Sequence, residues 1–538
     1  MTNIVSKLQE KIIKARNRDK WEASTSPFQC GGKKGVSTID HTMTVLEMIH
    51  RNKYLNKSTY LICIDMEKCF DKLWLESGVI ELWKSGMNVV DANTLLNMNR
   101  KADVIVDSPV GKTNMFTVNN VVKQGTIYGP AICSKEMECV NTSCHKTVSY
   151  YGPRIEIESL AYVDDLIAAI TKALSKTVLA NIGNLEDKKK MIVNMIKSNY
   201  MVVHKKKNEN TDLDATINQK KVKQTYEQEY LGTWISDKAS CQFNINKRIE
   251  KCNGVTKKIE EMTCVSRVGN LSTSLKIELY PIILISVLMF NMSAWGKWSQ
   301  ADEKSLERFQ GQTLRRLLKV PKTTPYLGIL WETGIWRVSD ELIYKQLMLL
   351  HNIMQSGDER ILKRIIIEQN VNPIPNCWLE CVKQRAKDVG IDVNVWEISK
   401  KKKPAFKKQI KDQIRANFVD YVLQNKTTKL RTVLKKPFMK RKFIVDGMLS
   451  PEEIRTILMT RLHMLKVKCN YRKSDSMLCQ FCGKENETTE HLFECSRIGY
   501  LKTDLRMEEL KLDEDNSADA RNVFKFVSRV EKIMIEHN

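Results

Sequence analysis

Short runs of β-branched and other apolar residues in the first half of the chain predict strands. They occur at residues 60–64, 155–162 and 200–204, and each has the length of an ordinary strand. From Asn244 onward apolar positions recur at helical spacing, and helical stretches dominate to about Met354. The pattern predicts a mixed α/β front followed by a helical back.

Residues 279–296 form an uncharged stretch of 18 residues that is comparable to a membrane span. The stretch contains Pro281, Asn291 and Ser293 and is barely long enough to cross a bilayer. The chain also begins MTNIVSK, with no apolar segment of a signal peptide behind it. We therefore expect a buried helix here, and a protein that neither spans a membrane nor is secreted.

The net charge of the chain indicates the kind of partner that it binds. The 538-residue chain has a formal net charge of +24 and a pI near 9.3, which indicates a polyanion, either nucleic acid or an anionic membrane surface. Its length suits three or four domains of roughly 100–200 residues, and 42% hydrophobic residues exclude wholesale disorder. With no signal peptide, the 15 cysteines are expected to be reduced thiols or metal ligands.

More than half of the net charge lies between residues 400 and 442. This segment has 16 Lys and Arg against two acids, which gives +14. Apolar residues recur among the charges at mostly helical spacing; they are Phe406, Ile410, Ile414, Phe418, Val422 and Leu430. The spacing predicts an apolar side and a strongly basic side. We expect a track for a nucleic-acid backbone; a solvated face and a nuclear-import signal are the alternatives.

Aspartates stand at the ends of two predicted strands. Asp65 ends one apolar run, and Asp164 and Asp165 separate two others, 155–162 and 166–170. The second arrangement indicates a tight hairpin with a carboxylate pair at its tip. Adjacent carboxylates raise each other's pKa unless a cation offsets them, and three carboxylates suit Mg²⁺. We therefore predict a magnesium site, with a solvent-exposed turn as the alternative.

The same aspartates carry a family resemblance. The run Tyr162-Val163-Asp164-Asp165 resembles the Tyr-x-Asp-Asp signature of reverse transcriptases, and residues 65–71 resemble their first palm motif. Residues 29–40 resemble the fingers segment of non-LTR (LINE-type) retrotransposon enzymes. Further palm motifs of the family are matched, in the family's order, at residues 122–130, 194–198 and 230–232. The resemblance covers about residues 5–345.

This resemblance implies a right-hand polymerase with fingers, palm and thumb. In such an enzyme Asp65, Asp164 and Asp165 would hold two Mg²⁺ ions. The 3′-hydroxyl of a DNA primer would attack the α-phosphate of a dNTP on an RNA template and release pyrophosphate.

Four other residues take roles from the resemblance. Phe70 corresponds to an aromatic side chain that excludes a 2′-hydroxyl; a plain core phenylalanine is the alternative. Gln124 and Gly125 would lie near the incoming nucleotide and template, where a glycine lets a backbone approach closely; otherwise they form a turn that opens a helix. Lys197 corresponds to a lysine that protonates the leaving pyrophosphate, with a surface lysine as the alternative.

An apolar stripe beyond the palm motifs predicts an amphipathic helix that stops at Pro321. Its members are Leu306, Phe309, Leu314, Leu317 and Leu318, and the other side carries Arg308, Gln312, Arg315 and Lys319. Residues 294–334 also resemble the segment that follows the palm in non-LTR elements. We expect a thumb helix whose basic side meets a duplex; a solvated face is the alternative.

A second candidate metal site lies near the end of the chain. Cys479, Cys482, His491 and Cys495 follow the spacing Cys-x2-Cys-x8-His-x3-Cys. Three thiolates and one imidazole have the types and number of ligands of a structural zinc site; scattered reduced cysteines are the alternative. The segment also resembles the C-terminal knuckle of non-LTR retrotransposon proteins, which implies nucleic-acid binding.

These features predict an α/β right-hand polymerase followed by a mostly helical basic region and a small zinc knuckle. The expected parts are partial fingers at 1–59, palm at 60–239, helical thumb at 240–355, a basic helical nucleic-acid-binding region at 356–470, a CCHC zinc knuckle at 471–500 and a tail at 501–538. The family's basic fingers segment before the Gln-x-Gly-Gly stretch has no counterpart, so we expect an N-terminally truncated chain.

The expected function is RNA-directed DNA polymerase of the non-LTR retrotransposon type, in the nucleus or cytoplasm. It would use two Mg²⁺ ions, structural Zn²⁺, dNTPs, an RNA template and a DNA primer or target. The alternative is a catalytically impaired, element-derived nucleic-acid-binding protein, and a group II intron maturase is a weaker third. The sequence leaves the oligomeric state open.

Overall fold

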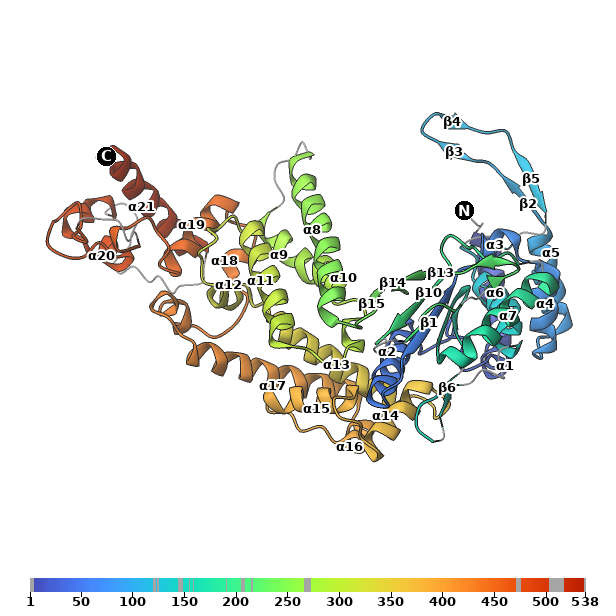
Figure 1. The fold of residues 1–538 in the computed structure, drawn as a ribbon. Helices are drawn as coiled ribbons and strands as arrows, with labels where there is room; N and C mark the ends of the chain where they lie inside the picture. Colours follow the sequence, from blue (N-terminus) through green and yellow to red (C-terminus); the bar gives the residue numbers. More distant parts are fainter. Residues whose placement is uncertain are drawn as a thin grey trace.

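The fold is that of a computed structural model, which describes residues 4–119, 122, 125–143, 149–153, 155–157, 159–189, 191–204, 209–213, 216–265, 272–470, 476–502 and 517–536. Figure 1 shows an α/β part, coloured blue to green, beside an elongated helical part, coloured light green to red. The predicted order of a mixed α/β front and a helical back is confirmed.

The centre of the α/β part is a five-stranded sheet in the order β13-β10-β1-β9-β8. Its strands are β1 (Thr59–Ile64), β8 (Leu160–Tyr162), β9 (Asp165–Ile170), β10 (Asn199–Val203) and β13 (Lys223–Thr225). Neighbours run antiparallel, except that β10 and β13 run parallel. Strands β1 and β10 confirm the strands predicted at 60–64 and 200–204.

Strand β1 lies at the middle of this sheet and is buried along its whole length. Its side chains alternate between the two faces. Leu61 and Cys63 belong to a core that continues into the helical part, whereas Tyr60, Ile62 and Ile64 belong to a second core on the opposite face. Burial on both faces explains why this run is continuously apolar.

The single strand predicted at 155–162 is wrong, because the segment forms two strands with different partners. Strand β7 (Glu156–Ile157) pairs with β6 (Ser149–Tyr150), whereas β8 pairs with β9. The main chain of Ala161 in β8 also bonds a distant segment, since Cys30 N–H donates to Ala161 O (3.0 Å) and Ala161 N–H donates to Phe28 O (2.9 Å). This long-range contact takes the place of a continued strand.

Helices cover both faces of the sheet. In the α/β part they are α1 (Ile4–Ser24), α2 (Thr38–Tyr54), α3 (Cys69–Lys72), α4 (Leu75–Lys84), α5 (Val89–Arg100), α6 (Gly129–Ser143) and α7 (Lys172–Lys189). Buried residues of α2 join the first core, and those of α4, α5, α6 and α7 join the second. The sheet is therefore a rigid layer between two sets of helices.

Short strand pairs complete the α/β part. The pairs are β2 (Lys101–Val104) with β5 (Phe116–Asn119), β3 (Asp107–Ser108) with β4 (Gly111–Lys112), β11 (Thr216–Ile217) with β12 (Lys220–Lys221), and β14 (Glu227–Tyr230) with β15 (Thr233–Ser236). The pairs between β2 and β5 form an arm that projects away from the body (Figure 1).

The helical part begins with the long helix α8. Its helices are α8 (Cys241–Val265), α9 (Thr273–Leu279), α10 (Ser286–Leu288), α11 (Gln300–Leu317), α12 (Tyr326–Thr333), α13 (Val338–Met354), α14 (Ile361–Val371), α15 (Trp378–Asp388), α16 (Val395–Lys400), α17 (Lys403–Gln424), α18 (Lys442–Val445), α19 (Pro451–Arg461), α20 (Thr489–Glu494) and α21 (Ser517–Glu536). Short 3₁₀ turns occur at Met292–Ala294, Thr428–Leu430, Val433–Lys435, Lys468–Asn470 and Ser496–Lys502.

The uncharged stretch at 279–296 is not the single buried helix that was expected. Helix α9 passes into a π-helical turn (Tyr280–Ile285), because Pro281 has no amide hydrogen for the regular helical pattern. The chain leaves the helix at Asn291, which has φ 55°. Among the described residues, no helix combines the length and apolarity needed to cross a membrane.

Two predicted amphipathic helices are confirmed. Helix α17 buries the apolar residues Phe406, Ile410, Ile414, Phe418 and Val422. Helix α11 buries Leu306, Phe309, Leu314 and Leu317, and Leu318 follows as its buried C-cap. On the other side of α11, Arg308 and Gln312 are exposed, whereas Arg315 is half-buried and donates through Nε to Thr324 O (2.9 Å).

The two parts of the molecule are joined between α2 and the segment around α14. Arg360 donates from Nε and Nη2 to the two carboxylate oxygens of Asp40, at 2.6 and 3.1 Å. Deeper in the contact, Gln369 Nε2 donates to Glu47 Oε2 at 2.5 Å. Glu47 is 4% exposed, and burial raises its pKa from 4.5 to about 7. This carboxyl therefore binds a proton more tightly in the folded chain than in the unfolded chain.

Replacement of this group should change how stability depends on pH. Because the folded pKa lies above the unfolded value, the contribution of Glu47 is fully present below about pH 4.5 and is lost as pH rises to about 7. Glu47→Gln removes that dependence, so the denaturation midpoint should fall less steeply with rising pH across this window. Glu397→Gln, at an exposed residue of α16, serves as the control. Equal pH slopes for Glu47→Gln and the parent chain would contradict this account.

Candidate active site and candidate metal centre

The central sheet brings the three predicted aspartates to one end of two neighbouring strands. Asp65 follows β1, Asp165 is the first residue of β9, and Asp164 lies in the turn between β8 and β9. Because β1 and β9 are antiparallel with Ile64 opposite Leu166, Asp65 comes beside Asp165. All three side chains are half-buried.

The aspartates repel one another. Burial raises the pKa of Asp165 from 3.8 to about 6, with further contributions from the charges of Asp164 and Asp65. Burial also raises the pKa of Asp164, and the charge of Asp65 adds to the rise, whereas its own backbone N–H and Lys197 oppose it. Three neighbouring carboxylates, of which Asp164 and Asp165 have raised pKa values, form a site that a divalent cation would stabilise.

A second segment of the chain lies against Asp65. The Asp65 N–H donates to Ser198 Oγ (3.1 Å), and the Asn194 N–H donates to Asp65 O (2.8 Å). Lys197 reaches the same residue, with Nζ 3.6 Å from Asp65 Oδ2, and its side chain is 67% exposed. The structure thus brings the predicted Lys197 to the aspartates and leaves its ammonium group largely open to solvent.

The other predicted site residues differ in how far the structure describes them. Phe70 is half-buried and packs against the second core, as does Val163 of the aspartate turn. Gly125 has φ 82°, and a Cβ there would meet no atom within 4 Å. Within the described structure, the glycine is therefore explained by its left-handed backbone and not by the close approach of a neighbouring residue. Gln124 lies outside the described residues.

One residue at this site had no role in the sequence interpretation. Gln29 belongs to the segment that resembles the fingers motif, and its buried side chain bonds the main chain of Val163. The contact spans 134 positions in the sequence, so no local pattern reveals it. The signal in the sequence is a polar residue followed, after Cys30, by two glycines, but this signal does not indicate a partner.

Two basic cavities lie in the helical part. A cavity of about 920 Å³ beside α11 is lined by one acid, Glu307, and by six basic residues: Lys304, Arg308, Arg315, Arg316, Lys319 and Lys322. A second cavity of about 910 Å³, the α17 cavity, lies between the start of α2, α13 and the start of α17. Among the described residues, no Asp or Glu lines this cavity, and its basic residues are Lys345, Arg360, Lys401, Lys402, Lys403 and Lys407. Such surfaces suit the phosphates of a nucleic acid.

The predicted Cys and His ligands meet near the end of the chain. The sulfur atoms of Cys479, Cys482 and Cys495 and a ring nitrogen of His491 all lie within 4.8 Å of one another. The structure therefore contains a Cys3His cluster.

The surroundings of the cluster favour metal binding. The backbone N–H groups of Lys484 and Glu485 lower the pKa of the Cys482 thiol from 9.0 to about 6, and His491 adds to the effect. His491 Nδ1 lies 3.1 Å from Glu485 Oε2, which leaves Nε2, 3.3 Å from Cys482 Sγ, directed at the thiols. In zinc sites, the ring nitrogen of a histidine ligand that does not bind the metal is typically hydrogen-bonded to a carboxylate.

Comparisons with known proteins bear on the α/β part. No curated protein matches the chain. A solved telomerase from Candida albicans, in complex with a fragment of telomeric RNA, is 13% identical, with a TM-score of 0.31 over 74% of this chain. The chain spans 56% of the length of that telomerase. Residues 1–235 match the family model described as "Reverse transcriptase (RNA-dependent DNA polymerase)". The chain therefore contains a reverse transcriptase domain, and the three aspartates lie inside it.

Proposed function

We propose that the chain is an RNA-directed DNA polymerase of the non-LTR retrotransposon type, which elongates a DNA primer on an RNA template. The observation that carries the proposal is the meeting of Asp65, Asp164 and Asp165 at one end of neighbouring strands within the reverse transcriptase domain. In this proposal residues 60–239 are the palm and residues 240–355 are the thumb, and the segment before them belongs to the fingers.

The donor set of the aspartates fits hard divalent cations. Carboxylate oxygens are the ligands that Mg²⁺ prefers, and a bound cation would favour the ionised forms that burial and mutual repulsion disfavour. When bound, two Mg²⁺ ions would activate the primer hydroxyl and stabilise the leaving oxygen.

The reaction joins the primer 3′-oxygen to the α-phosphorus of the dNTP. The bond from that phosphorus to the bridging oxygen breaks, the primer hydroxyl loses its proton, and pyrophosphate leaves and takes up a proton. Lys197, with Nζ 3.6 Å from Asp65 and largely exposed, would donate that proton or offset the developing charge. Phe70 would pack under the sugar, and Gln124 and Gly125 would lie near the nucleotide and template.

The rest of the chain would hold nucleic acid. The cavity beside α11 and the α17 cavity offer basic residues at two places, as a polymerase that grips a template and a primer requires. The Cys3His cluster would bind structural Zn²⁺ and act as a nucleic-acid-binding knuckle.

A second candidate is an element-derived nucleic-acid-binding protein without polymerase activity. The α17 cavity favours it, because its lysines come from elements that carry none of the three aspartates. In that case RNA would bind, but no primer would be extended.

Asp164→Asn should abolish extension of a DNA primer on an RNA template in the presence of Mg²⁺. The change removes one charged ligand and keeps the shape of the side chain, so we expect a loss of roughly 10³-fold, equivalent to about 4 kcal/mol. Asp420→Asn makes the same charge change at an exposed residue of α17 and should extend normally. Unchanged extension by Asp164→Asn would exclude the proposed site. No extension by the parent chain, with RNA still bound, would favour the second candidate.

The Mg²⁺ requirement should depend on pH. Asp165 has a raised pKa of about 6, so protons compete with the metal below that pH. The half-saturating Mg²⁺ concentration for primer extension should therefore rise as pH falls below about 6, by up to about tenfold per pH unit for one competing proton. Titration of Mg²⁺ at several pH values tests this. A half-saturating concentration that stays constant through this range would show that the carboxyl is not a ligand.

Cys482→Ser should remove zinc from the purified chain. The parent chain should contain one zinc per molecule, since the cluster has four ligands. Cys469→Ser is the matched control, because Cys469 is exposed and close in sequence but lies outside the cluster. Zinc content by atomic emission, and hydrogen exchange of residues 476–502, should change only in Cys482→Ser. Equal zinc content in both variants would argue against the site.

A further inference from the structure

The turn that carries Asp164 has an unfavourable backbone. Val163 lies between Tyr162 and Asp164 and has φ 60°. A β-branched residue rarely adopts this left-handed conformation, because its side chain crowds its own backbone. Such a conformation persists only where the surrounding structure imposes it.

The side chain of Gln29 imposes it. The Val163 N–H donates to Gln29 Oε1 at 2.9 Å, and Gln29 Nε2 donates to Val163 O at 3.2 Å. One amide thus bonds both main-chain polar groups of the strained residue. Gln29 is completely buried, so these bonds are shielded from competition with water.

The backbone around Gln29 is fixed against the same hairpin. Gln29 and Ala161 form a parallel bridge. Gly31 lies so close to the turn that a Cβ at this position would be 2.5 Å from both Val163 N and Val163 Cγ2. The Gly31 N–H also donates to Gln29 Oε1 at 3.0 Å, which orients the amide.

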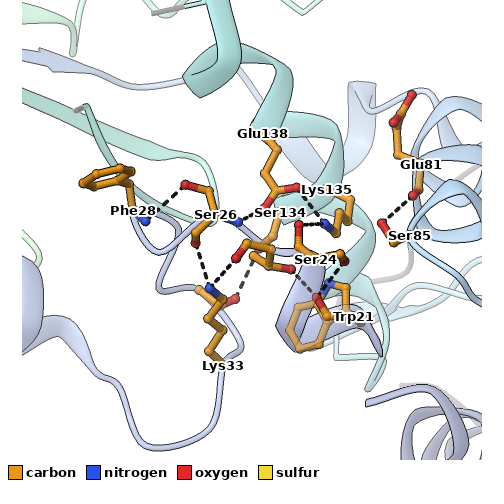
Figure 2. A network of polar contacts seen from close by, with 12 residues as sticks. Trp21, Ser24, Ser26, Phe28, Lys33, Glu81, Ser85, Ser134, Lys135 and Glu138 are labelled. Carbon is orange, nitrogen blue, oxygen red and sulfur yellow. Dashed lines mark hydrogen bonds and ion pairs between the residues drawn. The ribbon is translucent and has the colours of Figure 1, made fainter. Parts of the chain in front are cut away.

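A network of polar contacts anchors the segment that presents Gln29 (Figure 2). Lys33 Nζ donates to Thr25 O (2.9 Å) and Ser26 O (2.7 Å), so it holds the two sides of the segment together. Helix α6 makes two hydrogen bonds with this segment. The Ser26 N–H donates to Glu138 Oε1 at 2.6 Å, and Ser134 Oγ donates to Gly31 O at 3.3 Å. These hydrogen bonds hold in place the segment that presents the Gln29 amide.

We propose that Gln29 is a positioning residue for the metal site, which acts through Val163 to fix the directions of Asp164 and Asp165. The proposal rests on the polymerase function proposed above. Within the described structure, the Gln29 side chain bonds Val163 and Gly31 and neither aspartate. Its effect would come from the turn, since small displacements of reacting groups cost large factors in rate.

The test replaces Gln29 with a side chain of similar length that makes neither bond. Gln29→Met should lower kcat for RNA-templated extension by about 10–100-fold and raise the half-saturating Mg²⁺ concentration by about tenfold, with KM for dNTP nearly unchanged. Gly31→Ala disturbs the turn from the other side and should give the same pattern. Melting temperatures of both variants show that the chain remains folded.

Gln310→Met is the matched control. Gln310 is also completely buried, and its amide likewise bonds two main-chain groups, donating to Trp336 O (2.8 Å) and accepting from Val338 N–H (2.9 Å). This variant should lower the melting temperature without raising the Mg²⁺ requirement. A purely structural role for Gln29 would give the same result as Gln310→Met and would overturn the proposal.

Direct binding of Mn²⁺, measured by electron paramagnetic resonance, separates this proposal from the proposed function. If the parent chain binds Mn²⁺ and extends primers, unchanged Mn²⁺ affinity in folded Gln29→Met and Gly31→Ala overturns the role of Gln29 alone. If the parent chain neither binds Mn²⁺ nor extends primers, the proposed function fails and the role of Gln29 fails with it. Weaker Mn²⁺ binding in both variants, with normal binding in Gln310→Met, supports the proposal.

Discussion

The structure depends on holding three like charges together. Asp65, Asp164 and Asp165 come to one end of β1 and β9, where burial and their mutual repulsion raise the pKa values of the last two. Carboxylates on a flexible segment would move apart. Here β1 is buried on both faces and hydrogen-bonded to β9 and β10 on its two edges, which fixes the backbone that leads to Asp65. The turn before Asp164 and Asp165 is hydrogen-bonded to the Gln29 side chain and packs closely against Gly31.

Much of this arrangement could be predicted from the sequence because its signals are local. A buried strand followed by an aspartate, a hairpin with two aspartates and a Cys-Cys-His-Cys spacing each depend on neighbouring residues, and the structure places all of them as strands, turn and cluster. The apolar stripes of α11 and α17 are local in the same sense, because helical spacing determines which residues are buried.

The remaining features depend on contacts between distant residues. The strand predicted at 155–162 divides because Phe28 and Cys30 bond Ala161, and the amide of Gln29 finds Val163 across 134 positions. Arg315 lies on the predicted basic side of its helix, but it bonds a carbonyl of the next loop. The helix of the uncharged stretch becomes π-helical at Tyr280–Ile285, and the chain leaves the helix at Asn291. Periodicity in the sequence indicates which residues are buried, but it does not indicate which distant residues they contact.

In the proposed function, the helical part would bind the nucleic acid. It is joined to the α/β part by the Asp40–Arg360 pair and the buried Glu47–Gln369 contact. In the proposed function these contacts would keep the basic cavities and the aspartates on one body, so that the primer end stays at the metal site while the duplex moves.

The most direct test is a crystal structure of the chain with an RNA template, a DNA primer, a non-reactive dNTP analogue and Mn²⁺, analysed by anomalous scattering. The account predicts two anomalous peaks between Asp65, Asp164 and Asp165, bridged to the phosphates of the nucleotide. Bound nucleic acid with no anomalous peak at these aspartates would contradict it.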